Sequence, residues 1–364
     1  MFMRKLRTAI VGCGKVGHLH APALKDLPES EFVAVCARSP EKANLFAEKY
    51  HVAPFTDVAE MIQQAKVEAI CLCTPHPQHA APTIAAAKLG VHVLVEKPLA
   101  SSLEDCDAML AAARENQTII STVCQRRFYP PCQRIQQALQ AGKLGKPILG
   151  MATMFSWRDE AYYKSDPWRG SWKHEGGGVL VNQSPHQLDL LLWYMGEVEE
   201  VFGYWANLNH PYIEVEDTAV AVVKFKNGAL GNIIASNSQN PAINVRVQVH
   251  GANGASAGVQ TDGGAMFIAG RTTEIEAPFN DIWTIPGEEK FLPQWKAQDA
   301  QFFSSVKPME YFHRLQIQDF LRAIIESRPP AITGEDGRRT VELFTAIYRA
   351  TRDRKAIPFP LQPE

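Results

Sequence analysis

The 364-residue sequence lacks an excess of charge of either sign, since 37 Lys and Arg residues nearly balance 39 Asp and Glu residues and the formal net charge is −2. No large basic field is present to attract nucleic acid or an anionic membrane surface. No apolar run reaches membrane-spanning length, and the apolar stretch behind Arg4, Lys5 and Arg7 is too short for a signal peptide. We therefore expect a cytoplasmic protein that binds neither nucleic acid nor membrane.

Cysteine is scarce, and its placement argues against disulfides and metal sites. All seven cysteines lie in the first 132 residues, and no pair has C-x-x-C spacing. An odd number, several of them in apolar runs, favours small buried side chains in a reducing compartment. The histidines show no ligand spacing either, so we predict no metal.

The length suits two domains, and 46% hydrophobic with 21% charged residues is globular usage. Residues 6–124 alternate short β-rich runs with helical patterns, which predicts α/β architecture with a doubly wound parallel sheet. Beyond Leu144, β-type segments follow one another with few helices, which predicts an α+β part with an open, largely antiparallel sheet. Residues 251–310, rich in Gly and Pro, are the least predictable. We place the domains at 1–124 and 125–364, with the C-terminal helix able to pack back on the first domain.

A glycine-rich segment follows the first predicted strand and opens a helix; it consists of Gly12, Cys13, Gly14, Lys15, Val16 and Gly17. In this context the G-x-G-x-x-G pattern predicts a Rossmann dinucleotide site, where the glycines permit a tight turn, approach to a pyrophosphate and close helix packing. The helix N-terminus offers free N–H groups to the phosphates. An ordinary glycine turn is the less favoured alternative.

The end of the second predicted strand should contact the adenosine ribose, and it reads Ala37, Arg38, Ser39. An Asp or Glu that would accept hydrogen bonds from the ribose of NAD is missing before Glu41. Arg38 and Ser39 could instead hold the 2′-phosphate of NADP. Arg38 fits a solvated loop charge equally well.

Glu96, Lys97 and Pro98 follow a purely apolar strand. Ligands of open α/β sheets bind at the carboxyl ends of strands, which would place Lys97 at a cleft. On position alone, a functional lysine and a surface lysine are equally supported.

Asn182, His186 and Asp189 have the i, i+4 and i, i+3 spacings of one helix face. From the residues alone, an N-cap asparagine and a satisfied core histidine are the favoured interpretation.

Taken in order, these motifs resemble those of the Gfo/Idh/MocA family of glucose–fructose oxidoreductases, inositol dehydrogenases and rhizopine-catabolism proteins. The resemblance runs from about Arg7 to Ile357. It rests on the glycine motif, on residues 73–79 where the family usually has T-P-N-x-x-H, on the E-K-P of residues 96–98, and on residues 168–172, 176–178, 216–219 and 334–337.

The resemblance implies a nicotinamide-dependent oxidoreductase that moves a hydride to or from a carbinol carbon of a sugar, sugar derivative or cyclitol. It implies Lys97, Asn182 and His186 as the catalytic set. Two departures stand out: Asn182 replaces the Asp of inositol dehydrogenases, and His76 replaces the common Asn. It further implies cofactor contacts from Thr74, Pro75, His76, His79, Glu96, Lys97 and Arg126, in addition to the glycine motif and residues 37–39. The expected substrate contacts are Lys97, Arg127, Trp168, Arg169, Asn182 and His186.

The chemistry requires one acid/base group and one group that polarises the reacting oxygen. His186 suits proton transfer near neutral pH, and Lys97 as a cation can stabilise a developing alkoxide. NADP is slightly favoured over NAD. A redox-neutral enzyme with tightly bound NAD that cleaves glycosides, and a non-catalytic dinucleotide sensor, are the alternatives. The resemblance also implies a homodimer or homotetramer.

Overall fold

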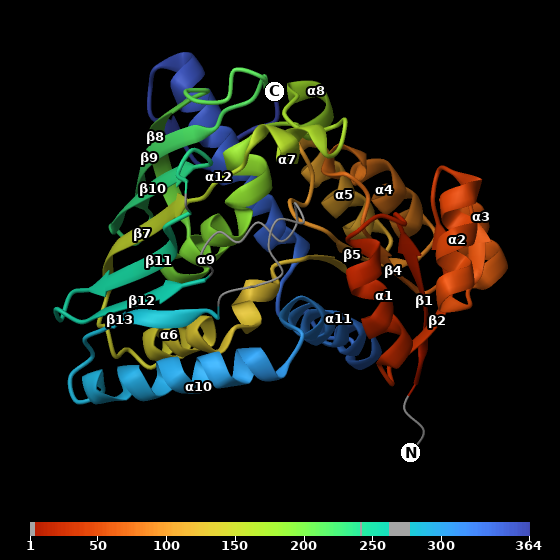
Figure 1. The fold of residues 1–364 in the computed structure, drawn as a ribbon, viewed down its shortest axis with the longest axis horizontal. Coiled ribbons are helices and arrows are strands. Elements are labelled where there is room, and N and C mark those ends of the chain that lie inside the picture. Colours follow the sequence, from red (N-terminus) through yellow and green to blue (C-terminus); the bar gives the residue numbers. More distant parts are fainter. Residues whose placement is uncertain (1–3, 241, 262–276) are drawn as a thin grey trace. The chain divides into compact units, whose positions relative to one another are not determined.

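The computed structural model describes residues 4–240, 242–261 and 277–364. The chain divides into two compact units (Figure 1). The first comprises Met1–Gln125, Met309–Arg338 and Glu364; the second comprises Arg126–Pro308 and Arg339–Pro363. Among the described residues, no helix is long and apolar enough to cross a membrane.

The first unit contains a six-stranded, wholly parallel sheet in the order β3-β2-β1-β4-β5-β6. Its strands are β1 (Leu6–Val11), β2 (Ser30–Cys36), β3 (Ala53–Phe55), β4 (Ala69–Leu72), β5 (His92–Val95) and β6 (Ile120–Thr122). β4 and most of β1 and β5 are buried, which explains their continuous apolar runs. The predicted doubly wound parallel sheet is confirmed.

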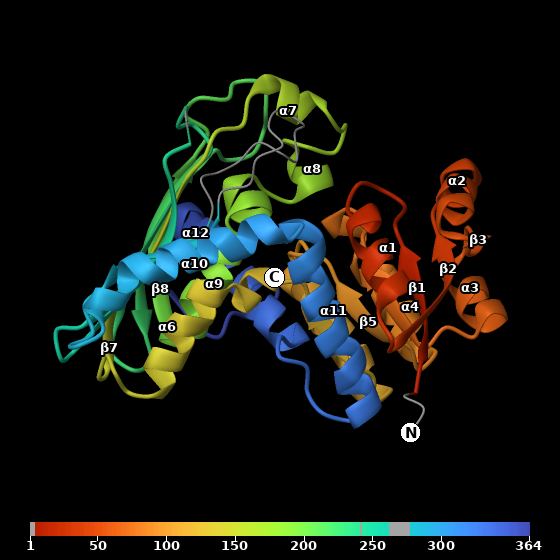
Figure 2. The same ribbon diagram turned by 60° about the horizontal axis from the view of Figure 1, so that its bottom comes forward.

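Helices connect these strands: α1 (Gly17–Asp26), α2 (Pro40–Tyr50), α3 (Val58–Ala65), α4 (Ala80–Lys88) and α5 (Leu103–Glu115). Ser39, Asp57 and Ser102 cap three of them by accepting a backbone N–H with their side chains. A later helix, α11 (Pro308–Glu326), lies beside α1 (Figure 2). Ile317 and Phe320 of α11 and Leu24 of α1 belong to one buried cluster.

The second unit is built on an eight-stranded sheet in the order β13-β12-β11-β7-β10-β9-β8-β14. Within the described part of this sheet, only β7 and β10 pair in parallel, which confirms the predicted largely antiparallel sheet. The strands are β7 (Pro147–Phe155), β8 (Val198–Ala206), β9 (Thr218–Phe225), β10 (Leu230–Ser236), β11 (Asn244–Gly251), β12 (Ser256–Gln260), β13 (Phe279–Trp283) and β14 (Ile357–Pro358).

The helices of the second unit are α6 (Pro130–Gln140), α7 (Glu160–Lys164), α8 (Trp172–Glu175), α9 (Pro185–Met195) and α10 (Leu292–Ser305); α12 (Gly334–Asp353) begins in the first unit and ends in the second. α9 packs against β7 and β11. Gly150 on β7 makes this packing close, because a Cβ there would lie 2.5 Å from Met195. α9 therefore covers one face of the sheet at β7 and β11.

Candidate active site

The three glycines of the motif have different physical roles. Gly12 has φ +107° and a Cβ there would lie 2.6 Å from the backbone of Cys73; a Cβ on Gly17 would lie 2.4 Å from the Gly12 carbonyl oxygen. Gly14 differs, because nothing lies within 4 Å of the position of its Cβ. Folding therefore demands glycine at 12 and 17, whereas at 14 it leaves open space beside the start of α1. Open space beside a helix N-terminus is what the predicted approach of a pyrophosphate to the backbone requires.

The loop after β2 presents Arg38 to solvent. Ser39 is half-buried, and its Oγ accepts a hydrogen bond from the backbone N–H of Lys42 at 3.3 Å, which caps α2. Glu41 lies in the first turn of α2 and is exposed. No carboxylate precedes it in this loop, as the sequence shows.

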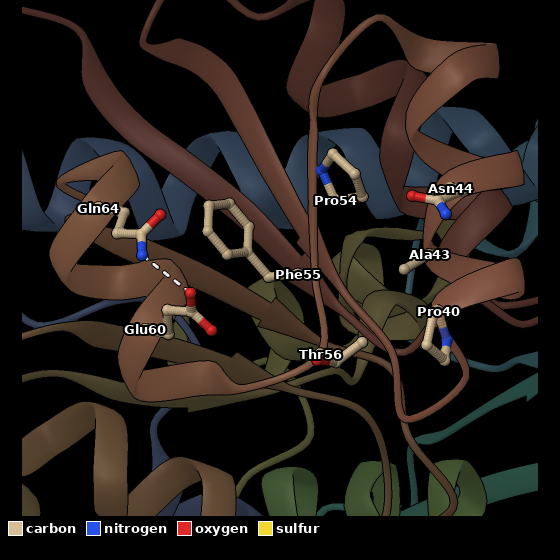
Figure 3. A pocket seen from close by; sticks show the side chains of 8 residues that line it. All are labelled: Pro40, Ala43, Asn44, Pro54, Phe55, Thr56, Glu60 and Gln64. Carbon is tan, nitrogen blue, oxygen red and sulfur yellow. Dashed lines mark hydrogen bonds between the residues drawn. The ribbon is translucent and has the colours of Figure 1, made fainter.

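A surface hollow lies beside this loop, among α2, β3 and α3 (Figure 3). Its lining residues are Pro40, Ala43, Asn44, Pro54, Phe55, Thr56, Glu60 and Gln64. Glu60 and Gln64 are hydrogen-bonded to each other at 2.8 Å. None of the residues predicted to contact the cofactor is among them.

Lys97 lies directly after β5, and its backbone N–H donates to Glu96 Oε2 at 3.2 Å. The buried ring of His79 lies between two loops at neighbouring strand ends: Nε2 is 2.8 Å from the Thr74 carbonyl oxygen and Nδ1 is 3.0 Å from that of Pro98. Since β1, β4 and β5 are parallel neighbours, the glycine turn, Thr74 and Lys97 all follow strands at the same edge of the sheet. This is the edge where α/β sheets bind ligands.

Behind Lys97, three buried side chains meet. His20 Nε2 lies 2.7 Å from Glu96 Oε1, and His313 Nε2 lies 3.9 Å from the same oxygen. Burial acts against the charged carboxylate, but the hydrogen bond and positive charge of His20 hold the pKa of Glu96 at about 2. Burial and the nearby His20 lower the pKa of His313 to about 4. The three possible ligand atoms lie within 4.8 Å of one another, as in a metal site. The direct hydrogen bond between His20 and Glu96 accounts for this arrangement without a metal ion.

In the second unit, Asn182 and His186 lie on two successive elements. Asn182 belongs to a π-helical turn, Val179–Gln183, and His186 lies in the first turn of α9, which begins at Pro185. The single continuous helix that the spacing suggested is therefore interrupted. Asp189 forms a buried bidentate ion pair with Arg127, at 2.8 and 2.6 Å. This pair favours a structural use of the Arg127 guanidinium, whose predicted substrate contact stays a prediction.

Asn182 contacts two polar side chains, Glu175 and Tyr162, that the sequence analysis does not predict as site residues. Its Nδ2 donates to Glu175 Oε1 and to the Tyr162 hydroxyl oxygen, the latter at 3.3 Å. Tyr162 also accepts from Arg169, whose guanidinium lies over the rings of Tyr162 and Trp168 at 4.3 and 4.5 Å. Asn182, Arg169 and Trp168 thus belong to one connected cluster.

A second carboxylate anchors the turn that carries Asn182. Glu216 is fully buried and accepts hydrogen bonds from the backbone N–H groups of Gly178 and Leu180, at 2.8 and 2.9 Å. The Tyr348 hydroxyl donates to it at 2.8 Å. Burial raises the pKa of Glu216 to about 7, against the lowering effect of these donors. A Cβ on Gly178 would lie 1.8 Å from the Glu216 carbonyl oxygen, so only glycine fits there.

Both units match families of known proteins. Residues 6–123 match the model of an oxidoreductase family with an NAD-binding Rossmann fold, and residues 132–256 match the GFO/IDH/MocA C-terminal domain. The chain belongs to the Gfo/Idh/MocA oxidoreductase family. Myo-inositol 2-dehydrogenase of Thermotoga maritima is 28% identical over 97% of this chain and 98% of that protein; scyllo-inositol 2-dehydrogenase of Bacillus subtilis is 28% identical over 98% and 96%.

Among solved structures, the WlbA dehydrogenase of Bordetella pertussis, in complex with NADH and UDP-GlcNAcA, superposes with a TM-score of 0.86 at 27% identity, covering all of both chains. The family match confirms the expected nicotinamide-dependent oxidoreductase. The two relatives are inositol 2-dehydrogenases, and the superposed structure holds NADH and UDP-GlcNAcA. The expected resemblance to the family is confirmed as well.

Sequence reasoning missed Glu175, His20 and Glu216 as residues of the site. Glu175 directly precedes the glycine triplet, and Glu216 opens a family motif, so both stood in segments already noted. Their partners, however, come from positions that only the fold brings together. His20 and Glu96, for instance, are 76 residues apart.

Proposed function

We propose that Lys97, His186 and Asn182 carry the oxidoreductase reaction. Bound nicotinamide supplies the hydride acceptor or donor. His186 takes or returns the hydroxyl proton, the Lys97 ammonium stabilises the developing alkoxide, and Asn182 orients the substrate hydroxyl. The observation that carries the proposal is the position of Lys97 after β5, at the same sheet edge as the open space at Gly14. Arg126, Trp168 and Arg169 keep their proposed contacts with cofactor or substrate.

The proposed substrate is a ring-shaped polyol, either a sugar derivative or a cyclitol. The support comes from relatives: two inositol dehydrogenases and a WlbA structure that holds UDP-GlcNAcA. The test is a screen of inositols, sugars, sugar acids and nucleotide-linked sugar acids with NAD and NADP in parallel, followed by the absorbance of the reduced cofactor. Turnover of no polyol with either cofactor would contradict the proposal.

For the cofactor, the exposed Arg38 and the carboxylate-free loop favour NADP over NAD. A guanidinium can offer two parallel hydrogen bonds to a 2′-phosphate. The N-terminus of α2 adds its positive end. Glu41 in the first turn of that helix opposes this effect.

We also propose that the protein is a homodimer or homotetramer that buries the outer face of the eight-stranded sheet. Alternate residues of its adjacent strands gather apolar side chains there: Leu149, Tyr204, Val220, Val222 and Leu230, all exposed in the single chain. Tyr204 pairs with Val220 across the β8–β9 ladder. Such a contiguous apolar face is typical of an interface. Sedimentation should show an oligomer that Val222→Lys dissociates; a monomeric native chain would contradict the proposal.

The seven cysteines, all within described segments, are free thiols, and six are buried. Free thiols in this number favour the reducing cytoplasm, which we propose as the location. Recovery of the protein in the periplasmic or membrane fraction of its host would contradict this.

A further inference from the structure

Glu175 is a buried carboxylate at the proposed active site. It is not one of the three residues, Lys97, His186 and Asn182, that carry the proposed reaction. Its side chain lies at the end of α8 and the residue is 1% exposed. A carboxylate so far from water is costly unless hydrogen-bond donors hold it. Two donors of the same unit do so: the backbone N–H of Gly170 donates to Oε2 at 2.5 Å, and Asn182 Nδ2 donates to Oε1.

These contacts determine which end of the Asn182 amide faces which neighbour. A carboxylate only accepts hydrogen bonds, so the amide must turn its NH₂ group toward Glu175. The second Nδ2 hydrogen is directed at the Tyr162 hydroxyl oxygen. Oδ1, the acceptor end of the amide, is then turned away from Glu175.

We propose that Glu175 is a positioning residue that fixes Asn182 as a hydrogen-bond acceptor toward the polyol substrate. This inference rests on the function proposed above for Asn182. With Oδ1 presented, Asn182 accepts a hydrogen bond from a second hydroxyl of the polyol and so orients the reacting hydroxyl, whose own hydrogen points to His186. Without Glu175, the amide is free to turn over and present a donor instead, which misplaces the hydroxyl.

Only a carboxylate can serve both donors at this position. The single oxygen of a glutamine can accept from Gly170 or from Asn182, but its NH₂ group then faces the other donor. Glu175→Gln is therefore a nearly isosteric change that disturbs the Asn182 amide. A matched control exists in Glu214, a glutamate of the same region whose Oε2 accepts from the backbone N–H of Trp172 at 3.2 Å.

The first arm of the test is kinetic. Glu175→Gln should lower kcat by at least about tenfold, as for loss of a substrate-orienting group, while the Kd of NADH or NADPH stays unchanged. Glu214→Gln should stay within about twofold of the native chain, and Glu175→Asp, which keeps a carboxylate, should fall in between. In an Asn182→Ala background, Glu175→Gln should lower kcat little further, because Glu175 acts through Asn182. Full additivity of the two losses would overturn the inference.

The second arm needs no turnover. The side-chain amide signal of Asn182 in a ¹⁵N NMR spectrum, assigned by its loss in Asn182→Asp, should shift in Glu175→Gln and stay in place in Glu214→Gln. An unshifted signal would overturn the inference even if the enzyme turns over sugars. A shifted signal in a chain that oxidises no polyol would uphold the Glu175–Asn182 relationship and contradict the proposed function. If Glu175→Gln does not fold, Glu175→Asp takes its place in both arms.

Discussion

His20 on α1 and Glu96 at the end of β5 form a buried hydrogen-bonded pair, with His20 Nε2 2.7 Å from Glu96 Oε1. Burial disfavours both charges, yet the hydrogen bond to the Glu96 carboxylate raises the pKa of His20 above its usual value. The hydrogen bond therefore favours the charged form of each partner. Because Glu96 also accepts the Lys97 N–H, the pair fixes the backbone that carries Lys97.

The pair predicts a specific dependence of stability on pH. The pKa of Glu96 falls from 4.5 to about 2 on folding, so its contribution is complete above about pH 4.5 and is lost as pH falls toward 2. That contribution is on the order of 3 kcal/mol. Urea unfolding at several pH values should show that the free energy of unfolding of the native chain decreases as pH falls from 4.5 toward 2. His20→Gln should lack this decrease. His20→Gln should also be the less stable variant at neutral pH, since a buried charge loses its partner. Parallel pH curves for the two chains would contradict this account.

Lys97→Ala should lower turnover by a factor on the order of 10² or more, as expected for losing a group that stabilises the alkoxide. Cofactor affinity should change little. Lys88→Ala, at the exposed end of α4, is the control and should behave like the native chain. Near-normal turnover of Lys97→Ala would remove Lys97 from the catalytic set.

The glycine motif predicts a separation between folding and cofactor binding. Gly14→Ala places a methyl group in open space, so its melting temperature should match that of the native chain. The same methyl group obstructs the pyrophosphate, and affinity for the cofactor should fall by about tenfold or more. Gly17→Ala should instead lower the melting temperature, because its Cβ would meet the Gly12 carbonyl oxygen at 2.4 Å. Calorimetry measures both the melting temperature and the cofactor affinity. An unchanged affinity in Gly14→Ala would show that the pyrophosphate does not approach the backbone at Gly14.

Cofactor choice depends on Arg38. One charge-assisted contact with the 2′-phosphate contributes roughly 1.5–3 kcal/mol, about a tenfold to hundredfold preference. We expect tighter binding of NADP than of NAD, and Arg38→Ala should remove most of the difference. Lys25→Ala, an exposed change in the last turn of α1, should leave it intact. Equal affinities, or tighter NAD binding, in the native chain would be incompatible with this prediction.

Asn182→Asp adds a carboxylate beside the one already supplied by Glu175. An added negative charge favours the protonated forms of His186 and Lys97. The pKa that governs oxidation should therefore rise, and the increase of activity should move to higher pH. A pH profile of kcat/KM checks this, and an unchanged or acid-shifted profile would count against it.

Local signals in the sequence predicted much of the fold. Ser39 and Pro40 predict a helix over residues 40–50, which the structure has. Lys226-Asn227-Gly228 is a sequence typical of a hairpin turn, and it forms the turn between β9 and β10. The short strand β3 and helix α3 were not predicted, and α10, β12 and β13 fall in the segment of residues 251–310 that offered no clear pattern. Residues 262–276 of that segment lie outside the described ranges.

The geometry around Asn182 shows why the rest could not be predicted. Spacing alone favours one helix through Asn182 and His186, but Pro185 starts a new helix, while Glu216 holds the N–H groups of Gly178 and Leu180. Contacts across more than 35 residues thus decide a local conformation. Residue spacing carries no information on such contacts.

Hydride transfer itself is the central claim, and isotope transfer in a single turnover tests it most directly. The enzyme, in excess over oxidised cofactor, is mixed with a polyol that carries deuterium on its carbinol carbons. We expect reduced nicotinamide to accumulate and to carry deuterium, and we expect Lys97→Ala to slow its formation. Consumption of the polyol without accumulation of deuterated cofactor would indicate redox-neutral chemistry and contradict the account.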